Sequence, residues 1–363
     1  MSTGIYFLIY NSFVFIWAFL LIFAFFKREK RQENYVKPKY SPKIKSVSIL
    51  IPCGSQHVDK LKEKIKAFNL FESFVKWDIV VVFDSKRPNK QPEFLAGVNT
   101  IYTGEWLGKT EAQNIGIKLC KNNVILLNDV DTVVTEYQLL VMLKEFEETK
   151  FCGVVTAPIK FLKDIKNTNT LARFVDLYWK CENRLRLILS EVGLLTTAAG
   201  PCMLINKNVW PEDGLDSRCG DDCALPLVAL GNNYIVLQSK CTPIIDYHYA
   251  DDSIEQSARK RMAERNVFAT IDCIKKYPKL YLYLPIIYSH KLSRWFTGIL
   301  FILQFPFLVY FYPFPTVASF LIFCSLSFFK LEVFANCIRL LRFNIALSLG
   351  TINYLLGNVR NKY

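Results

Sequence analysis

Residues 124–134 read Val-Ile-Leu-Leu-Asn-Asp-Val-Asp-Thr-Val-Val, and this stretch decides the fold. The apolar run 124–127 predicts a buried strand that ends in two carboxylates, Asp129 and Asp131. A spacing of two places both side chains on one side of an extended backbone. Two acids at a strand's carboxyl end suit Mg²⁺ or Mn²⁺, which prefer oxygen ligands and share them with phosphates. A solvated turn, where Asn and Asp are common, is the alternative.

The sequence on both sides of this stretch alternates between strand and helix patterns. Strands are predicted at 47–51, 78–83, 97–102 and 124–127, and helices at 58–71 and 110–120. This alternation predicts an α/β fold with a mostly parallel sheet. Ligands of such sheets bind beyond the carboxyl ends of the strands, so we expect Pro52, Asp84 and Asp129 to share one edge.

Six motifs follow one another through the middle of the chain. In order they read Val47-Ser-Ile-Leu-Ile-Pro52, Val80-Val-Val-Phe-Asp84, Gly108-Lys109-x4-Asn114-x-Gly116, Asp129-Val-Asp131, Gly220-Asp221-Asp222-x-x-Leu225 and Gln256-Ser-Ala-Arg259-Lys260. The series resembles family 2 glycosyltransferases of the Rossmann-like GT-A fold, over about residues 47–266. The layout of the flanking apolar segments is similar to that of membrane-bound members such as ceramide glucosyltransferases.

The resemblance implies a nucleotide-sugar donor and a divalent metal, Mg²⁺ or Mn²⁺, held by Asp129 and Asp131. Asp84 would accept hydrogen bonds from the nucleotide base, and Lys109 would neutralise phosphate charge as a point cation. The same resemblance places four further residues in the donor-binding set: Pro52, Asn114, Gln256 and Arg259. The alternatives are an Asp turn, a solvated Lys and, for the segment after Gln256, a basic amphipathic helix on anionic lipid.

Asp222 is the candidate catalytic base. Transfer of a sugar to a hydroxyl needs a group that takes the proton, and this acid begins a helix predicted at 222–230. Its neighbour Asp221 would cap the helix or orient the base. The alternative is that Asp222 serves only as a helix cap.

Three departures from the family pattern affect the expected product. Lys260 stands where the family has Trp, Asp221 where it has Glu, and the first strand ends Pro-Cys-Gly-Ser. In chain-elongating members the Trp lines the acceptor channel, so its absence favours transfer of a single sugar. A processive polysaccharide synthase, a nucleotidyltransferase and a non-catalytic membrane scaffold are the other functions considered.

The amino-terminal segment predicts a membrane anchor. Residues 1–26 contain no charged side chain and, as a helix, are long enough to cross a bilayer. Residues 27–45 follow with eight basic and two acidic side chains, which predicts a linker on the cytoplasmic side. An integral membrane protein with its catalytic domain, residues 46–283, in the cytoplasm is therefore expected, and a membrane lipid is the expected acceptor.

The carboxy-terminal segment, residues 284–363, extends the membrane prediction. An uncharged run at 295–329 contains Pro313 and Pro315 and predicts a hairpin of two spans. The further apolar segment 343–359 is of marginal length, and the sequence leaves open whether it crosses.

Composition excludes two other classes of protein. The net charge of +13 lies beside the apolar segments, with no basic face interleaved with aromatic residues, so no nucleic-acid partner is expected. The 11 cysteines show no Cys-x-x-Cys pair and are expected to stay reduced.

Overall fold

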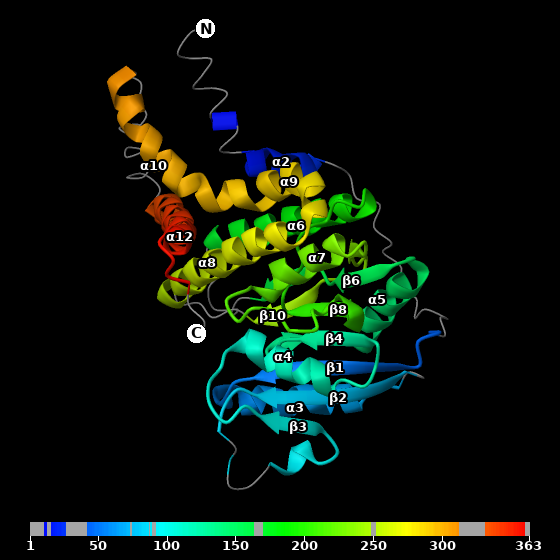
Figure 1. Ribbon diagram of the computed structural model, residues 1–363. Coiled ribbons are helices and arrows are strands. Elements are labelled where there is room, and N and C mark those ends of the chain that lie inside the picture. The colour runs from blue at the N-terminus through cyan, green and yellow to red at the C-terminus, as the bar shows by residue number, and fades with distance from the viewer. Residues whose placement is uncertain are drawn as a thin grey trace.

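The computed structural model describes residues 11–12, 16–26, 42–72, 75–86, 88, 92–162, 170–247, 252–311 and 331–359. A seven-stranded sheet forms the centre, helices cover both of its faces, and further helices from both ends of the chain lie beyond one side (Figure 1).

The central sheet confirms the prediction of an α/β fold with mostly parallel strands. Only β8 runs antiparallel to its neighbours, β4 and β6. In spatial order the strands are β3 (Asn99–Tyr102), β2 (Lys76–Phe83), β1 (Ser46–Cys53), β4 (Val124–Asn128), β8 (Cys202–Asn206), β6 (Cys152–Thr156) and β9 (Ile235–Gln238). The predicted strands differ from the observed ones by one or two residues at their ends.

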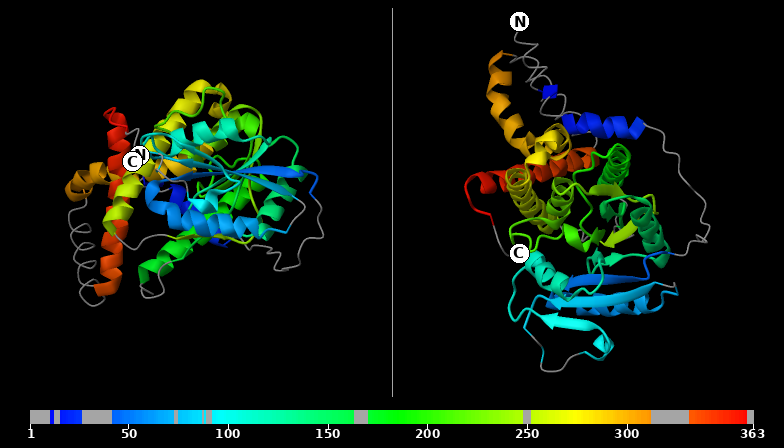
Figure 2. Two further views of the ribbon diagram at one scale, coloured as in Figure 1. Left: turned by 90° about the horizontal axis from the view of Figure 1, so that it is seen from below. Right: turned by 45° about the vertical axis from the view of Figure 1, so that its right-hand side comes forward.

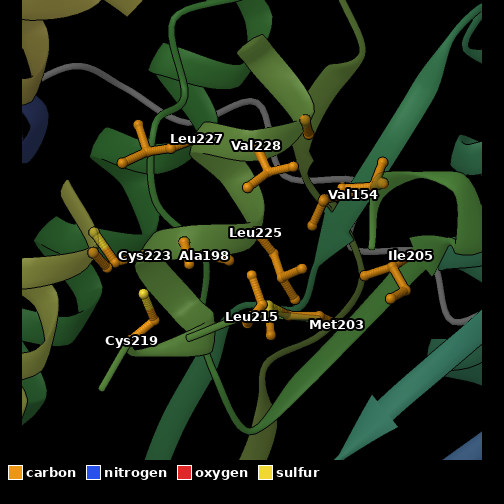
Figure 3. Close-up of a cluster of buried hydrophobic side chains, with 14 of the residues drawn as sticks. Val154, Ala198, Met203, Ile205, Leu215, Cys219, Cys223, Leu225, Leu227 and Val228 are labelled. Atoms are coloured by element: carbon orange, nitrogen blue, oxygen red, sulfur yellow. The ribbon is translucent and has the colours of Figure 1, made fainter. Parts of the chain in front are cut away.

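Each face of this sheet carries its own hydrophobic core, because side chains alternate along every strand. In β1, Ile49 and Ile51 pack with α3 (Val58–Asn69) and α5 (Glu136–Glu148). Leu50 points the other way, into the core formed with α4 (Lys109–Leu119), α6 (Thr170–Glu191), α7 (Asp221–Gly231) and α8 (Asp252–Lys276). Figure 3 shows the part of this second core that surrounds α7, including Ala198, Met203 and Leu225.

A small second sheet lies where the chain leaves β4. Its order is β5 (Thr132–Val133), β10 (Ile244–Tyr247) and β7 (Ile159–Leu162). β5 pairs antiparallel with β10, and β10 pairs parallel with β7. Because β5 begins directly after Asp131, both ends of the turn that carries Asp129 and Asp131 are anchored in sheets.

The other elements are short turns and helices from the two ends of the chain. The short 3₁₀ or π segments are η1 (Ser55–His57), η2 (Glu93–Leu95), η3 (Lys207–Val209), η4 (Pro278–Tyr283) and η5 (Tyr288–Leu292). The end helices are α2 (Ile16–Phe26), α9 (Leu284–Ile287), α10 (Ser293–Phe311) and α12 (Leu331–Leu355). α2 and α10 lie on the side of the molecule opposite β3, as Figures 1 and 2 both show.

The prediction of an integral membrane protein with a cytoplasmic catalytic domain is wrong. Within the residues that the structure describes, none of the helices combines the length and the apolar character that crossing a membrane requires. α2 has 11 residues, about 16 Å of helix against a hydrocarbon core of about 30 Å. Parts of the predicted spans and linker, at 1–10, 13–15, 27–41 and 312–330, lie outside the described residues.

The segment 343–359 lies largely within α12, which packs along α8. This 25-residue helix carries Glu332, Arg339 and Arg342. Asn353 Nδ2 donates a hydrogen bond to Glu264 Oε2 of α8 at 3.1 Å. The carboxy-terminal region is therefore joined to the core of the fold through α8.

Candidate functional site

A buried lysine of α3 holds the backbone of the turn after β4. Lys64 Nζ of α3 donates to the side-chain oxygen of Asn128, to the carbonyl of Asp129 at 2.5 Å and to that of Thr132 at 2.6 Å. Burial lowers the pKa of Lys64 to about 8, so the group remains largely protonated at neutral pH. These three hydrogen bonds fix the backbone of the turn that carries Asp129 and Asp131.

Lys109 joins two of the predicted site residues. Its Nζ lies 2.7 and 3.0 Å from the two carboxylate oxygens of Asp129 and 3.1 Å from Asp221 Oδ2. These two acids lie in the turn after β4 and at the start of α7, and they are 92 residues apart in the chain. The structure thus brings three predicted site residues into direct contact at the carboxyl end of β4.

The start of α4 positions Lys109. Gly108, the N-cap, has φ +99°, a conformation that glycine adopts at little cost. Asp84 Oδ1 accepts the N–H of Leu107 at 2.6 Å, and its Oδ2 accepts that of Gly108 at 2.8 Å. Gly116 brings the helix against the sheet, since a Cβ there would lie 2.3 Å from Leu50 Cδ1. The positive φ at Gly108 and the close packing at Gly116 therefore explain why the motif has glycine at both positions.

Asp221 is held as a carboxylate. Burial alone would raise its pKa, but Lys109 and the hydrogen bond from Gln113 Nε2, at 2.7 Å, keep the pKa below its usual range. Burial raises the pKa of Asp129 to about 6, assisted by the charges of Asp221 and Asp131 and opposed by Lys109. Asp129 and Asp221 thus share Lys109, and the charge of Asp131 adds to theirs, an arrangement that a further cation would stabilise.

Asp222 lies beside this group, in the first turn of α7. Gly220, not Asp222, is the N-cap of the helix, so the capping alternative does not describe its position. Burial raises the pKa of Asp222, and the charge of Asp221 raises it further. A buried carboxyl with a raised pKa in this position has the character of a general base.

The remaining predicted residues occupy different surroundings. Asn114 bonds the backbone of Leu215 through both its amide atoms, at 2.8 Å each, and accepts from Trp210 Nε1 at 3.1 Å, so it fastens the loop that follows β8. Pro52 lies in β1 next to Val82 of β2. Gln256 and Arg259 lie partly exposed on α8. Their predicted roles, like that of Asp84 at a nucleotide base, stay predictions.

The acids around Lys109 fit a metal that arrives with a phosphate-bearing substrate. In the described part of the chain, no group of three or more His, Cys, Asp or Glu side chains is arranged to hold a metal alone. Mg²⁺ and Mn²⁺ are commonly held by one or two carboxylates, with phosphates and water as the other ligands. Asp129 and Asp131 supply such a pair, with the carboxylate of Asp221 close by.

Sequence reasoning missed Lys64 and Gln113. The sequence did contain an indication that Lys64 is buried. This lysine lies on the apolar face of α3, together with the buried residues Leu61, Ile65 and Phe68. A lysine on such a face must find oxygen partners inside the fold.

Comparison with known proteins identifies the domain. The family described as Glycosyl transferase family 2 matches residues 48–210. The chain carries a family 2 glycosyltransferase domain. The matched part of this glycosyltransferase includes Asp84, Lys109, Asp129 and Asp131 and ends before Asp221.

A solved structure supports the fold of the glycosyltransferase. It is the mannosyltransferase PcManGT from Pyrobaculum calidifontis in complex with GDP-Man and Mn²⁺, with a TM-score of 0.65, 14% identity and 96% of each chain covered. This confirms the predicted GT-A-like fold. None of the curated proteins matches the sequence.

Proposed function

We propose that this glycosyltransferase moves a single sugar from a nucleoside-diphosphate sugar to a hydroxyl group of a lipid acceptor, with inversion at the sugar carbon. The observation that carries the proposal is the contact of Lys109 with both Asp129 and Asp221, with Asp222 beside them. A cation, metal-ligand carboxylates and a base candidate then lie at one edge of the sheet.

The donor's diphosphate would be held on the β4 side of the site. Asp129 and Asp131 would hold Mg²⁺ or Mn²⁺, which would stabilise the charge of the departing diphosphate. Lys109 would add a second positive charge to the same phosphates. Resemblance to ceramide glucosyltransferases favours a UDP-linked sugar, and the mannosyltransferase with bound GDP-Man makes a GDP-linked sugar the second candidate.

Asp222 would act as the base. As the acceptor oxygen forms its bond to the anomeric carbon, the bond from that carbon to the diphosphate breaks, and the hydroxyl proton passes to the Asp222 carboxylate. One displacement of this kind inverts the anomeric configuration. Asp221, tied to Lys109 and Gln113, would keep the first turn of α7 in place.

Support for a lipid acceptor comes from apolar side chains on the end helices. Phe23 and Phe26 of α2 are 57% and 77% exposed, and Leu303 and Tyr310 of α10 are 60% and 79% exposed. Exposed apolar side chains in such numbers are typical of surfaces that bind apolar partners.

The test is a screen of UDP- and GDP-linked sugars against a lipid extract, read out as nucleoside diphosphate release and as product mass. The expected result is a lipid whose mass rises by one sugar residue. Products with many sugars would instead indicate a polysaccharide synthase, and pyrophosphate release from a nucleoside triphosphate would indicate a nucleotidyltransferase.

A further inference from the structure

A second group of buried charges lies on α6, outside the motifs of the sequence. Glu182 has only 2% of its side chain exposed and is surrounded by cationic and imidazole groups. Its Oε1 lies 2.6 Å from Lys291 Nζ, 3.0 Å from Arg186 Nε and 3.2 Å from His290 Nε2. Arg294 reaches the same helix and donates to the hydroxyl of Tyr178. We call Glu182, Arg186, His290 and Lys291 the α6 cluster.

The α6 cluster holds more positive than negative charge. Burial lowers the pKa of His290 to about 4, so this ring is neutral at neutral pH. Arg186 and Lys291 then face one carboxylate, and the charge of Arg294 lies close by. Buried charges are costly unless they are paired, so a surplus cation in such a position favours binding of an anion.

One donor and one acceptor in the α6 cluster have no hydrogen-bond partner among the described residues, since the neutral His290 ring carries its proton on Nε2, which faces Glu182. Arg186 Nη1 and His290 Nδ1 are buried and make no hydrogen bond to any described residue. Arg186 donates a hydrogen bond to Glu182 through Nε, so its Nη1 remains available to a ligand. The side chain of Lys291 is 14% exposed, against 2–4% for the other three members, so it is the member through which a ligand would reach the cluster.

The α6 cluster lies near the proposed base. Burial and Asp221 raise the pKa of Asp222, while Lys109, Lys291 and Arg186 oppose that rise. Asp222 therefore lies within electrostatic range both of the cluster and of Lys109. The largest charge effects on Asp129 come from Lys109, Asp221 and Asp131, not from the cluster. In Figure 1, α6 lies between α7 and α2.

We propose that Arg186 and Lys291 form a binding subsite for an oxyanion, a phosphate or carboxylate, that the acceptor carries close to its reacting hydroxyl. This inference rests on the proposed function, because it assigns the region around Arg186 and Lys291 to the acceptor. Arg binds oxyanions through paired N–H groups, and Lys adds a mobile positive charge. Glu182 holds both cations in place while no acceptor is bound.

The test is titration of the full chain with inorganic phosphate, followed by calorimetry, while Mg²⁺ and UDP or GDP saturate the donor site. We expect saturable phosphate binding that Lys291→Gln weakens by about 10- to 100-fold, the effect of losing one charge-assisted hydrogen bond. Lys291→Arg should retain binding. Lys240→Gln, which removes an exposed lysine paired with Glu191, is the matched control and should bind as the wild type does.

Glu182→Gln should change phosphate affinity in the opposite direction from Lys291→Gln. The substitution removes the internal anion that competes for both cations, so phosphate should bind more tightly than to the wild type. A cluster with only a structural role would lose thermal stability in this variant without any gain in phosphate affinity, and that result would overturn the proposal.

Two further outcomes separate this inference from the proposed function. Phosphate binding that disappears when UDP or GDP is bound would show that the cluster serves the donor's phosphates, and the acceptor assignment would then be wrong. Failure of the wild type to bind either nucleotide would contradict the proposed function. The phosphate titration without nucleotide would still decide whether Arg186 and Lys291 bind an oxyanion.

Discussion

The backbone carbonyl of Asp222 accepts a hydrogen bond from the N–H of Ala198 at 2.8 Å. In a regular helix this carbonyl would accept the N–H of residue 226, but Pro226 has none. A proline inside α7 therefore frees the carbonyl of the proposed base to bind the loop before β8. The hydroxyls of Thr196 and Thr197 in that loop are buried and make no hydrogen bond to any described residue.

Pro226→Ala tests this link. The alanine N–H would compete with Ala198 for the Asp222 carbonyl, so the loop would lose one hydrogen bond to the base. We expect kcat to fall by about 2- to 10-fold, the equivalent of one such bond, with the donor KM unchanged. Steady-state kinetics and a melting curve check it. An unchanged kcat would show that the loop does not position the base.

Asp222→Asn tests the base itself. Asparagine keeps the size of the side chain but does not take a proton from the acceptor, so kcat should fall by about 10²- to 10⁴-fold. Donor affinity and Tm should change little. Asp216→Asn, which alters a more exposed acid paired with Arg218, is the matched control. Near-normal turnover in Asp222→Asn would remove this residue as the base and direct attention to Asp221.

Lys64→Met tests the support of the metal-binding turn. The change leaves the carbonyls of Asp129 and Thr132 and the amide oxygen of Asn128 without their shared donor. We expect the free energy of unfolding to fall by about 2–4 kcal/mol and Mn²⁺ affinity to fall with it. Denaturant unfolding and metal titration measure the two effects. Lys66→Met, an exposed position on the same helix, should change neither, and equal behaviour of both variants would argue against the role of Lys64.

Removal of divalent metal should abolish transfer, and Mn²⁺ or Mg²⁺ should restore it. Asp131→Ala should prevent the restoration, because it removes one of the two proposed ligands. Activity assays in excess EDTA, with and without added metal, make the comparison. Full activity in EDTA would contradict metal assistance.

Metal binding should also depend on pH. The pKa of Asp129 is raised to about 6, and a metal binds its ionised form. Below about pH 6 a proton must leave as the metal binds, so the apparent Mn²⁺ affinity should fall about tenfold per pH unit, and above about pH 7 it should be constant. Calorimetric titration between pH 5 and 8 with UDP or GDP present measures this. A constant affinity over the whole range would show that Asp129 is not a ligand.

Local sequence patterns determined the strands, the helices and the residues at the strand ends. The apolar run 124–127 and the helical spacing of apolar residues in α4 involve only residues that are close in the chain. The spacing of apolar residues therefore predicts these strands and helices from the sequence. The parallel sheet followed, and with it the expectation that Asp84 and Asp129 lie at one edge. The membrane prediction failed because the apolar character of a segment determines neither the length of the helix it forms nor the charged residues that this helix includes: α2 has 11 residues, and α12 carries Glu332, Arg339 and Arg342.

Only the tertiary structure decided which charges meet. Lys109 contacts an acid 20 residues away and another 112 residues away, and Lys64 contacts the turn after β4 across the core. The α6 cluster joins Glu182 to Lys291, 109 residues apart. The spacing of apolar residues along the sequence predicts which face of a helix or strand is buried. It does not predict which residue from a distant part of the chain packs against that face. Pairing among buried charges depends on distances of a few ångströms, which only the packed chain fixes.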